Sequence, residues 1–127
     1  MNLLLDTLVF LWWDAGDRRL NAAARQAIEE PRNSIFVSAA SIWEVAIKRR
    51  LGKLAFDGSA VAAIAANGFL ELPILPRDAE AAGNLDWPHN DPFDRLLVAQ
   101  AVRRGLVLAT ADQTIRAFET AAQLWAR

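Results

Sequence analysis

The chain has 127 residues, enough for one folded domain with a sizeable core. Its 54% hydrophobic and 23% charged residues are ordinary for a folded protein and argue against disorder. The net charge of −1 gives no overall attraction for nucleic acid, and the absence of cysteine excludes disulfides and thiolate metal sites.

The N-terminal sequence predicts a cytoplasmic protein. Met1 and Asn2 lead directly into the apolar run Leu3–Leu5, with no basic segment of the kind that opens a signal peptide. No apolar stretch approaches the length of a membrane span. We therefore expect a cytoplasmic protein with no membrane partner, in which residues 1–127 form a single domain.

Strand-like and helix-like segments alternate along the chain. The first half contains, in order, a strand at Leu3–Leu5, a helix beginning at Thr7, a helix at Asn21–Glu30, a strand at Ile35–Val37 and a helix at Ser41–Leu51. The second half contains a helix at Asp57–Asn67, a strand at Phe69–Ile74, helices at Arg77–Ala82 and Asp91–Arg104, a strand at Leu106–Ala109, a helix at Asp112–Thr120 and a strand at Gln123–Trp125.

Local signals support these assignments. Short continuous apolar runs are typical of strands buried on both faces, whereas Pro73 places its strand at a sheet edge. Pro92 at the start and Gly105 at the end frame the longest helix, and Gly52, Gly68 and Gly83 are further stop signals. The alternation predicts an α/β fold with a mostly parallel sheet of four to five strands.

Four acidic residues lie near predicted strand ends: Asp6, Glu44, Asp94 and Asp112. The carboxyl ends of parallel strands line one crevice, so these side chains are expected to crowd together there. Two like charges about 4 Å apart repel by roughly 4 kcal/mol at an effective dielectric near 20. Either some of the carboxylates take up protons or a cation neutralises them. Oxygen ligands without cysteine suit Mg²⁺ or Mn²⁺, and such a site suits hydrolysis of phosphodiesters.

Each acid also has a structural interpretation. Asp6, Asp112 and Asp91, the last directly before Pro92, could cap the helices that follow them, and Asp94 would then be a first-turn acid favoured by the helix dipole. Ser41 and Glu44 have the spacing of a capping box, and Glu44 could pair with Lys48. Both interpretations stay open for each residue taken alone.

Other chemistries have less support in the sequence. His89 is the one histidine, so the sequence gives little support for a catalytic triad of a nucleophile with histidine. We interpret His89 as a loop residue or a substrate contact. No glycine-rich phosphate loop follows the first strand. Local basic patches occur at Lys48, Arg49, Arg50 and Lys53 and at Arg103 and Arg104, where solvated helix faces are the simpler explanation.

The chain resembles the PIN-domain family, and more narrowly the VapC-type toxins of bacterial toxin–antitoxin pairs. The resemblance runs from residue 2 to about residue 125. Its most specific parts are a Trp-Glu block and an Asp-Pro-Phe-Asp-Arg block, in this order and spacing. The matching segments are Leu3–Thr7, Ser38–Glu44, Asp91–Ala101 and Leu108–Asp112.

The resemblance implies a three-layer α/β/α fold and a Mg²⁺- or Mn²⁺-dependent endoribonuclease, a homodimer held inactive by a small antitoxin. Asp6, Asp94 and Glu44 match metal ligands, and Asp112 matches an acid that acts through water. Thr7 and Thr110 fall where the family places hydroxyls, with Asp91 as a further candidate. The candidates for contacting RNA phosphates are Lys48, Arg49, Arg50, Lys53 and Arg95. The sequence departs from the pattern at Leu8, where histidine is common.

Three rival functions remain. A phosphatase of the haloacid dehalogenase type would need a second aspartate two residues after Asp6, and Leu8 occupies that position. A receiver domain would need a lysine near the C-terminal end of the sheet, and no lysine follows Lys53. A catalytically silent PIN-like binding module is harder to exclude, although retention of all four acids is unexpected in one.

Overall fold

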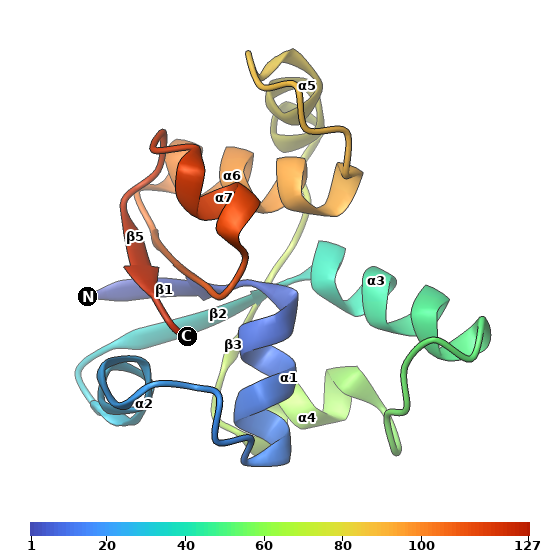
Figure 1. The fold of residues 1–127 in the computed structure, drawn as a ribbon, viewed down its shortest axis with the longest axis vertical. Coiled ribbons are helices and arrows are strands. Elements are labelled where there is room, and N and C mark those ends of the chain that lie inside the picture. Colours follow the sequence, from blue (N-terminus) through green and yellow to red (C-terminus); the bar gives the residue numbers. More distant parts are fainter.

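A computed structural model describes all residues of the chain, 1–127. Its five strands form one sheet between layers of helices (Figure 1). The strands are β1 (Asn2–Leu5), β2 (Ser34–Ser38), β3 (Leu70–Leu72), β4 (Val107–Thr110) and β5 (Gln123–Trp125). The helices are α1 (Thr7–Ala15), α2 (Ala22–Glu29), α3 (Ala39–Arg50), α4 (Ala60–Ala66), α5 (Pro76–Asn84), α6 (Pro92–Arg104) and α7 (Gln113–Ala117). None of the helices is both long enough and apolar enough to cross a membrane.

The sheet is parallel throughout, with the strand order β3-β2-β1-β4-β5. From β1 the chain moves outward to β2 and β3, and it then returns through α6 to place β4 on the other side of β1. Strand order therefore reverses between β1 and β4, which is where parallel α/β sheets open a crevice for ligands. The predicted α/β class, the mostly parallel sheet of four to five strands and the edge position of β3 are confirmed.

Two apolar clusters cover the two faces of the sheet. Leu3 and Leu5 of β1 point into one cluster together with residues of α1, α2 and α4. Leu4 points the other way, into a cluster with residues of α6 and α7. The alternation follows from the two-residue period of a strand, and because both faces are buried the strand is apolar at every position. This arrangement is the predicted three-layer α/β/α fold.

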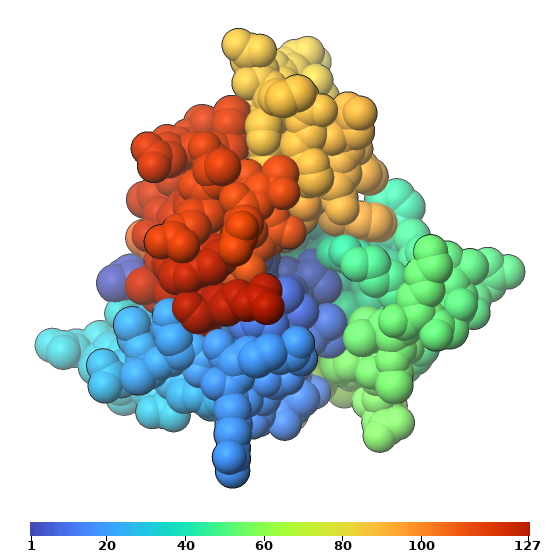
Figure 2. Space-filling model, viewed as in Figure 1, coloured from blue at the N-terminus to red at the C-terminus, as the bar shows by residue number.

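The C-terminal strand is fastened to the segment before α2. Figure 2 shows the C-terminal residues, in red, lying against the early blue part of the chain. The backbone N–H of Asn21 donates to the carbonyl of Ala126 at 2.8 Å, and its side-chain amide donates to the carbonyl of Trp125 at 2.9 Å. The amide oxygen of Asn21 also caps α2 by accepting from Ala24.

Four predicted helix limits are corrected. Helix α4 begins at Ala60, after its cap Ser59, and not at Asp57. Helix α3 begins at Ala39 and is capped by Ser38, so Ser41 and Glu44 do not form the expected capping box. Helix α5 continues through Gly83, whose φ is not positive, to Asn84, whereas α7 ends early at Ala117. The extended apolar run Phe69–Ile74 yields only the short strand β3, since Pro73 has no N–H for strand pairing.

A buried acid on α5 fastens this helix to α6. Asp78 is 0% exposed and pairs with Arg103 and, at 2.8 Å, with Arg104. Burial acts to raise the pKa of Asp78, but the Leu75 N–H and the two guanidinium groups hold that pKa below its ordinary value. These two ion pairs join α5 to α6, the two helices that precede β4.

We expect Asp78→Ala to lower the free energy of unfolding by about 3–5 kcal/mol, because it leaves two arginines without their buried partner. Urea denaturation followed by circular dichroism measures the loss. The control is Asp86→Ala, which removes an exposed acid from the nearby loop. Equal stability of the two variants would contradict a structural role for the buried pair.

Candidate active site

A cleft of about 300 Å³ opens at the carboxyl ends of β1 and β4. It brings together all four predicted acids and Asp91, although these residues come from distant parts of the sequence. The complete lining is Asp6, Thr7, Leu8, Leu11, Glu44, Lys48, Lys53, Leu54, Asp91, Asp94 and Asp112. The position agrees with the crevice that the reversal of strand order creates.

Asp6 lies at the base of the cleft, between β1 and α1. Its Oδ1 accepts a hydrogen bond from the backbone N–H of Val9 at 2.7 Å. Asp6 therefore caps α1, which confirms the structural interpretation of this residue. Its Oδ2 accepts the Thr110 hydroxyl at 2.6 Å and the backbone N–H of Ala111 at 3.0 Å. Capping and a place in the cleft are thus compatible for the same carboxylate.

The two predicted hydroxyl residues hold the cleft in different ways. Thr110, at the end of β4, donates to Asp6 and accepts the backbone N–H of Asp112 at 3.0 Å, so it links two acids. Thr7 donates its hydroxyl to Ser41 at 2.9 Å. That contact joins α1 to α3 and accounts for Ser41 better than the expected capping role.

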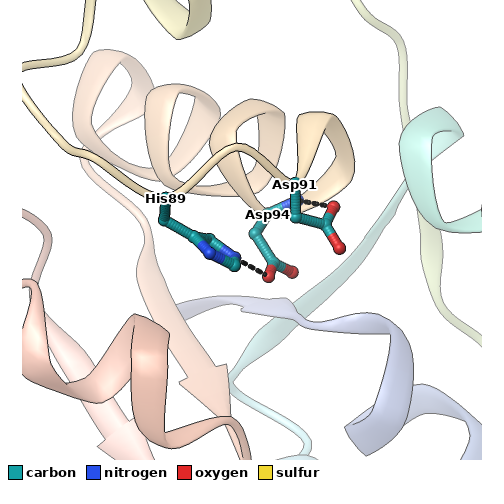
Figure 3. A group of neighbouring side chains, drawn as sticks. All are labelled: His89, Asp91 and Asp94. Carbon is teal, nitrogen blue, oxygen red and sulfur yellow. Dashed lines mark hydrogen bonds and ion pairs between the residues drawn. The ribbon is translucent and has the colours of Figure 1, made fainter.

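Helix α6 and the loop before it bring His89, Asp91 and Asp94 close together (Figure 3), and the two aspartates of this group line the cleft. Oδ1 of Asp91 caps the helix by accepting the N–H groups of Phe93 and Asp94. His89 Nε2 lies 2.7 Å from Oδ2 of Asp94. Ligand atoms of these three residues all lie within 4.8 Å of one another.

Asp112 and Glu44 complete the acidic wall. Asp112 caps α7 through Oδ1, which accepts from Thr114 at 2.7 Å and Ile115 at 3.0 Å. Glu44 pairs with Lys48 one turn later on α3 at 2.7 Å, as the spacing predicted, and this contact raises the pKa of Lys48. In Glu44, Asp91, Asp94 and Asp112 alike, one carboxylate oxygen is bonded within the protein and the other has no protein partner.

The electrostatics of the cleft oppose ionisation of two acids. Desolvation raises the pKa of Asp6 to about 6, although the Thr110, Val9 and Ala111 hydrogen bonds act to lower it. Desolvation likewise raises the pKa of Asp94 to about 6 against the His89 contact, and Asp91 and Asp112 raise it further by repulsion. The raised values mean that negative charge is costly here unless a cation is nearby.

The donor set fits a hard divalent cation. All five carboxylates in the cleft offer oxygen, and four of them keep one oxygen outside the protein's own hydrogen bonds. Mg²⁺ and Mn²⁺ prefer such ligands, and a cation would relieve the desolvation and repulsion that raise the two pKa values. The imidazole of His89 is the one nitrogen donor in the acidic cluster.

The structure places two of the five predicted phosphate-binding residues in the cleft. Lys48 and Lys53 line the cleft. Arg49 instead donates to the carbonyls of Phe56 and Gly58, and Arg50 is an exposed residue outside the cleft lining.

The prediction for Arg95 is corrected. Its guanidinium makes five hydrogen bonds to backbone carbonyls, which uses every N–H that an arginine has. No N–H remains for a phosphate, so Arg95 has a structural role.

Sequence reasoning left the contact of His89 with Asp94 unassigned. The five-residue spacing places the histidine outside α6, so helix periodicity says nothing about where its ring lies. The one available signal was the position of the histidine two residues before the Asp91-Pro92 helix start, in the segment that carries the predicted metal ligand Asp94.

A parallel α/β sheet with an acidic, oxygen-rich cleft at its reversal point defines a class of proteins suited to binding a hard cation. Residues 3–121 match the PIN domain family. The chain belongs to the PIN-domain family. It is 35% identical over 118 residues to Ribonuclease VapC22 of Mycobacterium tuberculosis, covering 90% of this chain and 89% of that protein.

Solved structures share the fold. VapBC2 from Rickettsia felis, bound to a DNA fragment from its promoter, matches with a TM-score of 0.72 and 11% identity over 100% of both chains. VapBC-1 from nontypeable Haemophilus influenzae matches with a TM-score of 0.62 and 16% identity, covering 98% of this chain and 97% of that one. FitAcB from Neisseria gonorrhoeae gives a TM-score of 0.62 and 16% identity, covering 97% and 96%.

Proposed function

We propose that the protein is a Mg²⁺- or Mn²⁺-dependent endoribonuclease and the toxin of a toxin–antitoxin pair. The observation that carries the proposal is the convergence of five carboxylates with Lys48 and Lys53 in one cleft at the reversal point of the sheet. The similarity to a ribonuclease supports RNA as the substrate class. A bound divalent ion would supply activation of water and stabilisation of charge on the phosphate.

The acids have distinct roles in this proposal. Asp6 and Asp94 hold the ion, and the hydrogen bonds of Thr110 and His89 keep these two carboxylates in place. Glu44 orients the attacking water through the oxygen that Lys48 does not engage. Asp112 acts through a water, and Asp91 adds negative charge while capping α6. Lys48 and Lys53 attract the RNA phosphates toward the acids.

An antitoxin and a second copy of the chain are the proposed protein partners. The proposal of an antitoxin partner is supported by the similarity of the fold to VapBC structures. The chain also has apolar surface outside the cleft: Trp43 is 55% exposed and Val61 is 49% exposed. Both residues line an apolar hollow of about 370 Å³ formed by α3, α4 and the end of β3.

Cleavage of RNA with and without metal tests the proposed function. Purified protein should cut single-stranded RNA in Mg²⁺ or Mn²⁺, stop when a chelator is added and recover when the ion is restored. Cleavage that persists in chelator would refute the metal mechanism. Metal binding without any cleavage would favour the silent binding module. The phosphatase alternative is disfavoured by membership of the PIN family and by Leu8, which supplies no second acid.

The lysines of the cleft should contribute to RNA affinity. We expect Lys53→Gln to weaken binding of single-stranded RNA and to reduce the slope of log affinity against log salt by about 0.7, the value for one lost phosphate contact. Fluorescence anisotropy in chelator measures binding without cleavage. Arg18→Gln, which removes an exposed charge outside the cleft lining, is the control. Equal slopes for the two variants would place the phosphate path elsewhere.

A further inference from the structure

The segment between α5 and α6 has no regular secondary structure, yet one side chain ties it together. Arg95 donates from Nε at 2.9 Å, from one terminal nitrogen at 2.7 and 3.0 Å, and from the other at 3.2 and 2.7 Å. The acceptors are the carbonyls of Ala82, Trp87, His89, Gly83 and Leu85, respectively. A rigid five-donor fork holds the loop from the end of α5 as far as His89.

A column of rings fixes the imidazole that this loop carries. His89 packs on Trp87 with 4.8 Å between ring centroids, and Trp87 stacks on Phe118 at 4.5 Å with 2° between the planes. Phe118 directly follows α7 as its C-terminal cap residue, and Asp112 caps the other end of that helix. The imidazole is thereby restrained through its backbone by Arg95 and through its ring by the stack. Its Nε2 is directed at the carboxylate of Asp94 (Figure 3).

We propose that His89 is the positioning residue for Asp94, and that Arg95 acts on the metal site only by holding His89 in place. This inference rests on the proposed function, in which Asp94 binds the ion. The hydrogen bond from Nε2 fixes Oδ2, and Asp94 then presents its other oxygen in one orientation. Carboxylates that bind metals are commonly oriented by such outer hydrogen bonds, and loss of the partner costs about 10- to 100-fold in metal affinity.

An outer role suits His89 better than direct ligation. Mg²⁺ and Mn²⁺ prefer oxygen, and the cleft already offers oxygen from five carboxylates. The Nε2–Oδ2 distance of 2.7 Å is that of a short hydrogen bond to an ionised group.

Titration of the purified full chain with Mn²⁺, followed by calorimetry, tests the proposal without using activity. For His89→Ala we expect the dissociation constant for Mn²⁺ to rise by about 10- to 100-fold. His89→Gln keeps an N–H donor near the position of Nε2 and should recover most of the affinity. If both variants lose affinity for Mn²⁺, the imidazole itself is a ligand of the ion, and the positioning role is wrong.

Arg95→Lys tests the second half of the proposal. Lysine has three donors and no fork, so it cannot hold five carbonyls, and Mn²⁺ affinity should fall. In a His89→Ala background the same substitution should have no further effect, because its path runs through His89. The control is Arg25→Lys: Arg25 holds the carbonyls of Asp17 and Leu20, away from the cleft, and its loss should leave Mn²⁺ affinity unchanged.

The outcomes separate this inference from the proposed function. If the natural chain binds Mn²⁺ and His89→Ala binds it equally well, the positioning role is wrong and the metal-dependent function stands. If the effects of His89→Ala and Arg95→Lys on affinity simply add, Arg95 does not act through His89. If the natural chain binds no Mn²⁺, both proposals fail.

Discussion

Asp94→Asn is expected to cleave RNA at least about 1,000-fold more slowly than the natural chain at saturating Mg²⁺, a loss of roughly 4 kcal/mol of transition-state stabilisation. The amide keeps the size of the carboxylate, and its oxygen can still accept a hydrogen bond from His89 Nε2. The amide is neutral, so it cannot offset the charge of a bound cation as the carboxylate does. The loss should therefore appear in the chemical step and in metal binding rather than in folding.

Thermal denaturation distinguishes this loss from unfolding. The pKa of Asp94 is raised to about 6, first by desolvation and further by repulsion from Asp91 and Asp112. Removing the charge relieves both costs, so the metal-free variant should melt at an equal or higher temperature than the natural chain at neutral pH. Asp86→Asn, an exposed change outside the cleft lining, should alter neither activity nor melting. Cleavage by Asp94→Asn within about tenfold of the natural rate would remove Asp94 from the metal site.

Without metal, the protein is expected to lose stability as the pH rises from about 4 to about 7. The pKa of Asp6 rises from 3.8 in its ordinary state to about 6 in the fold. Two pKa units correspond to about 3 kcal/mol, and Asp94 contributes in the same direction.

The sign follows from proton binding. Between the two pKa values the folded state holds a proton that the unfolded state has released, so the free energy of unfolding falls as pH rises. The associated stability is complete below the unfolded pKa and is lost as the pH passes through about 6. Asp78, whose pKa is lowered, contributes the opposite trend only at lower pH.

Urea denaturation at about pH 5 and about pH 7.5, in chelator, measures the effect. Mg²⁺ or Mn²⁺ should restore stability at the higher pH, because the ion binds the ionised folded form. The natural chain should show a larger decrease than Asp94→Asn, which lacks one of the two titrating groups. A metal-free protein that becomes more stable over this interval would contradict the description of the cleft.

The prediction of the fold succeeded where local chemistry decides structure. Leu3–Leu5 and Leu106–Ala109 are apolar at every position, and they form the strands that flank the reversal point. Pro92 and Gly105 mark α6 correctly. Ser41 was misassigned because both Ser38 and Ser41 are plausible caps, and only the course of β2 into α3 selects Ser38. Gly83 was wrongly predicted to end α5, because glycine also fits inside a helix and here its φ is not positive.

Sequence alone determined the order of the acids and the class of ion that their oxygens suit, because residue type and position after a strand are local properties. Tertiary structure alone decided that desolvation raises the pKa of Asp6 and Asp94, that all side-chain N–H groups of Arg95 bind backbone carbonyls, and that His89 contacts Asp94. These outcomes depend on strand order, loop path and desolvation. Such properties arise from contacts between distant segments, and no spacing along the chain encodes them directly.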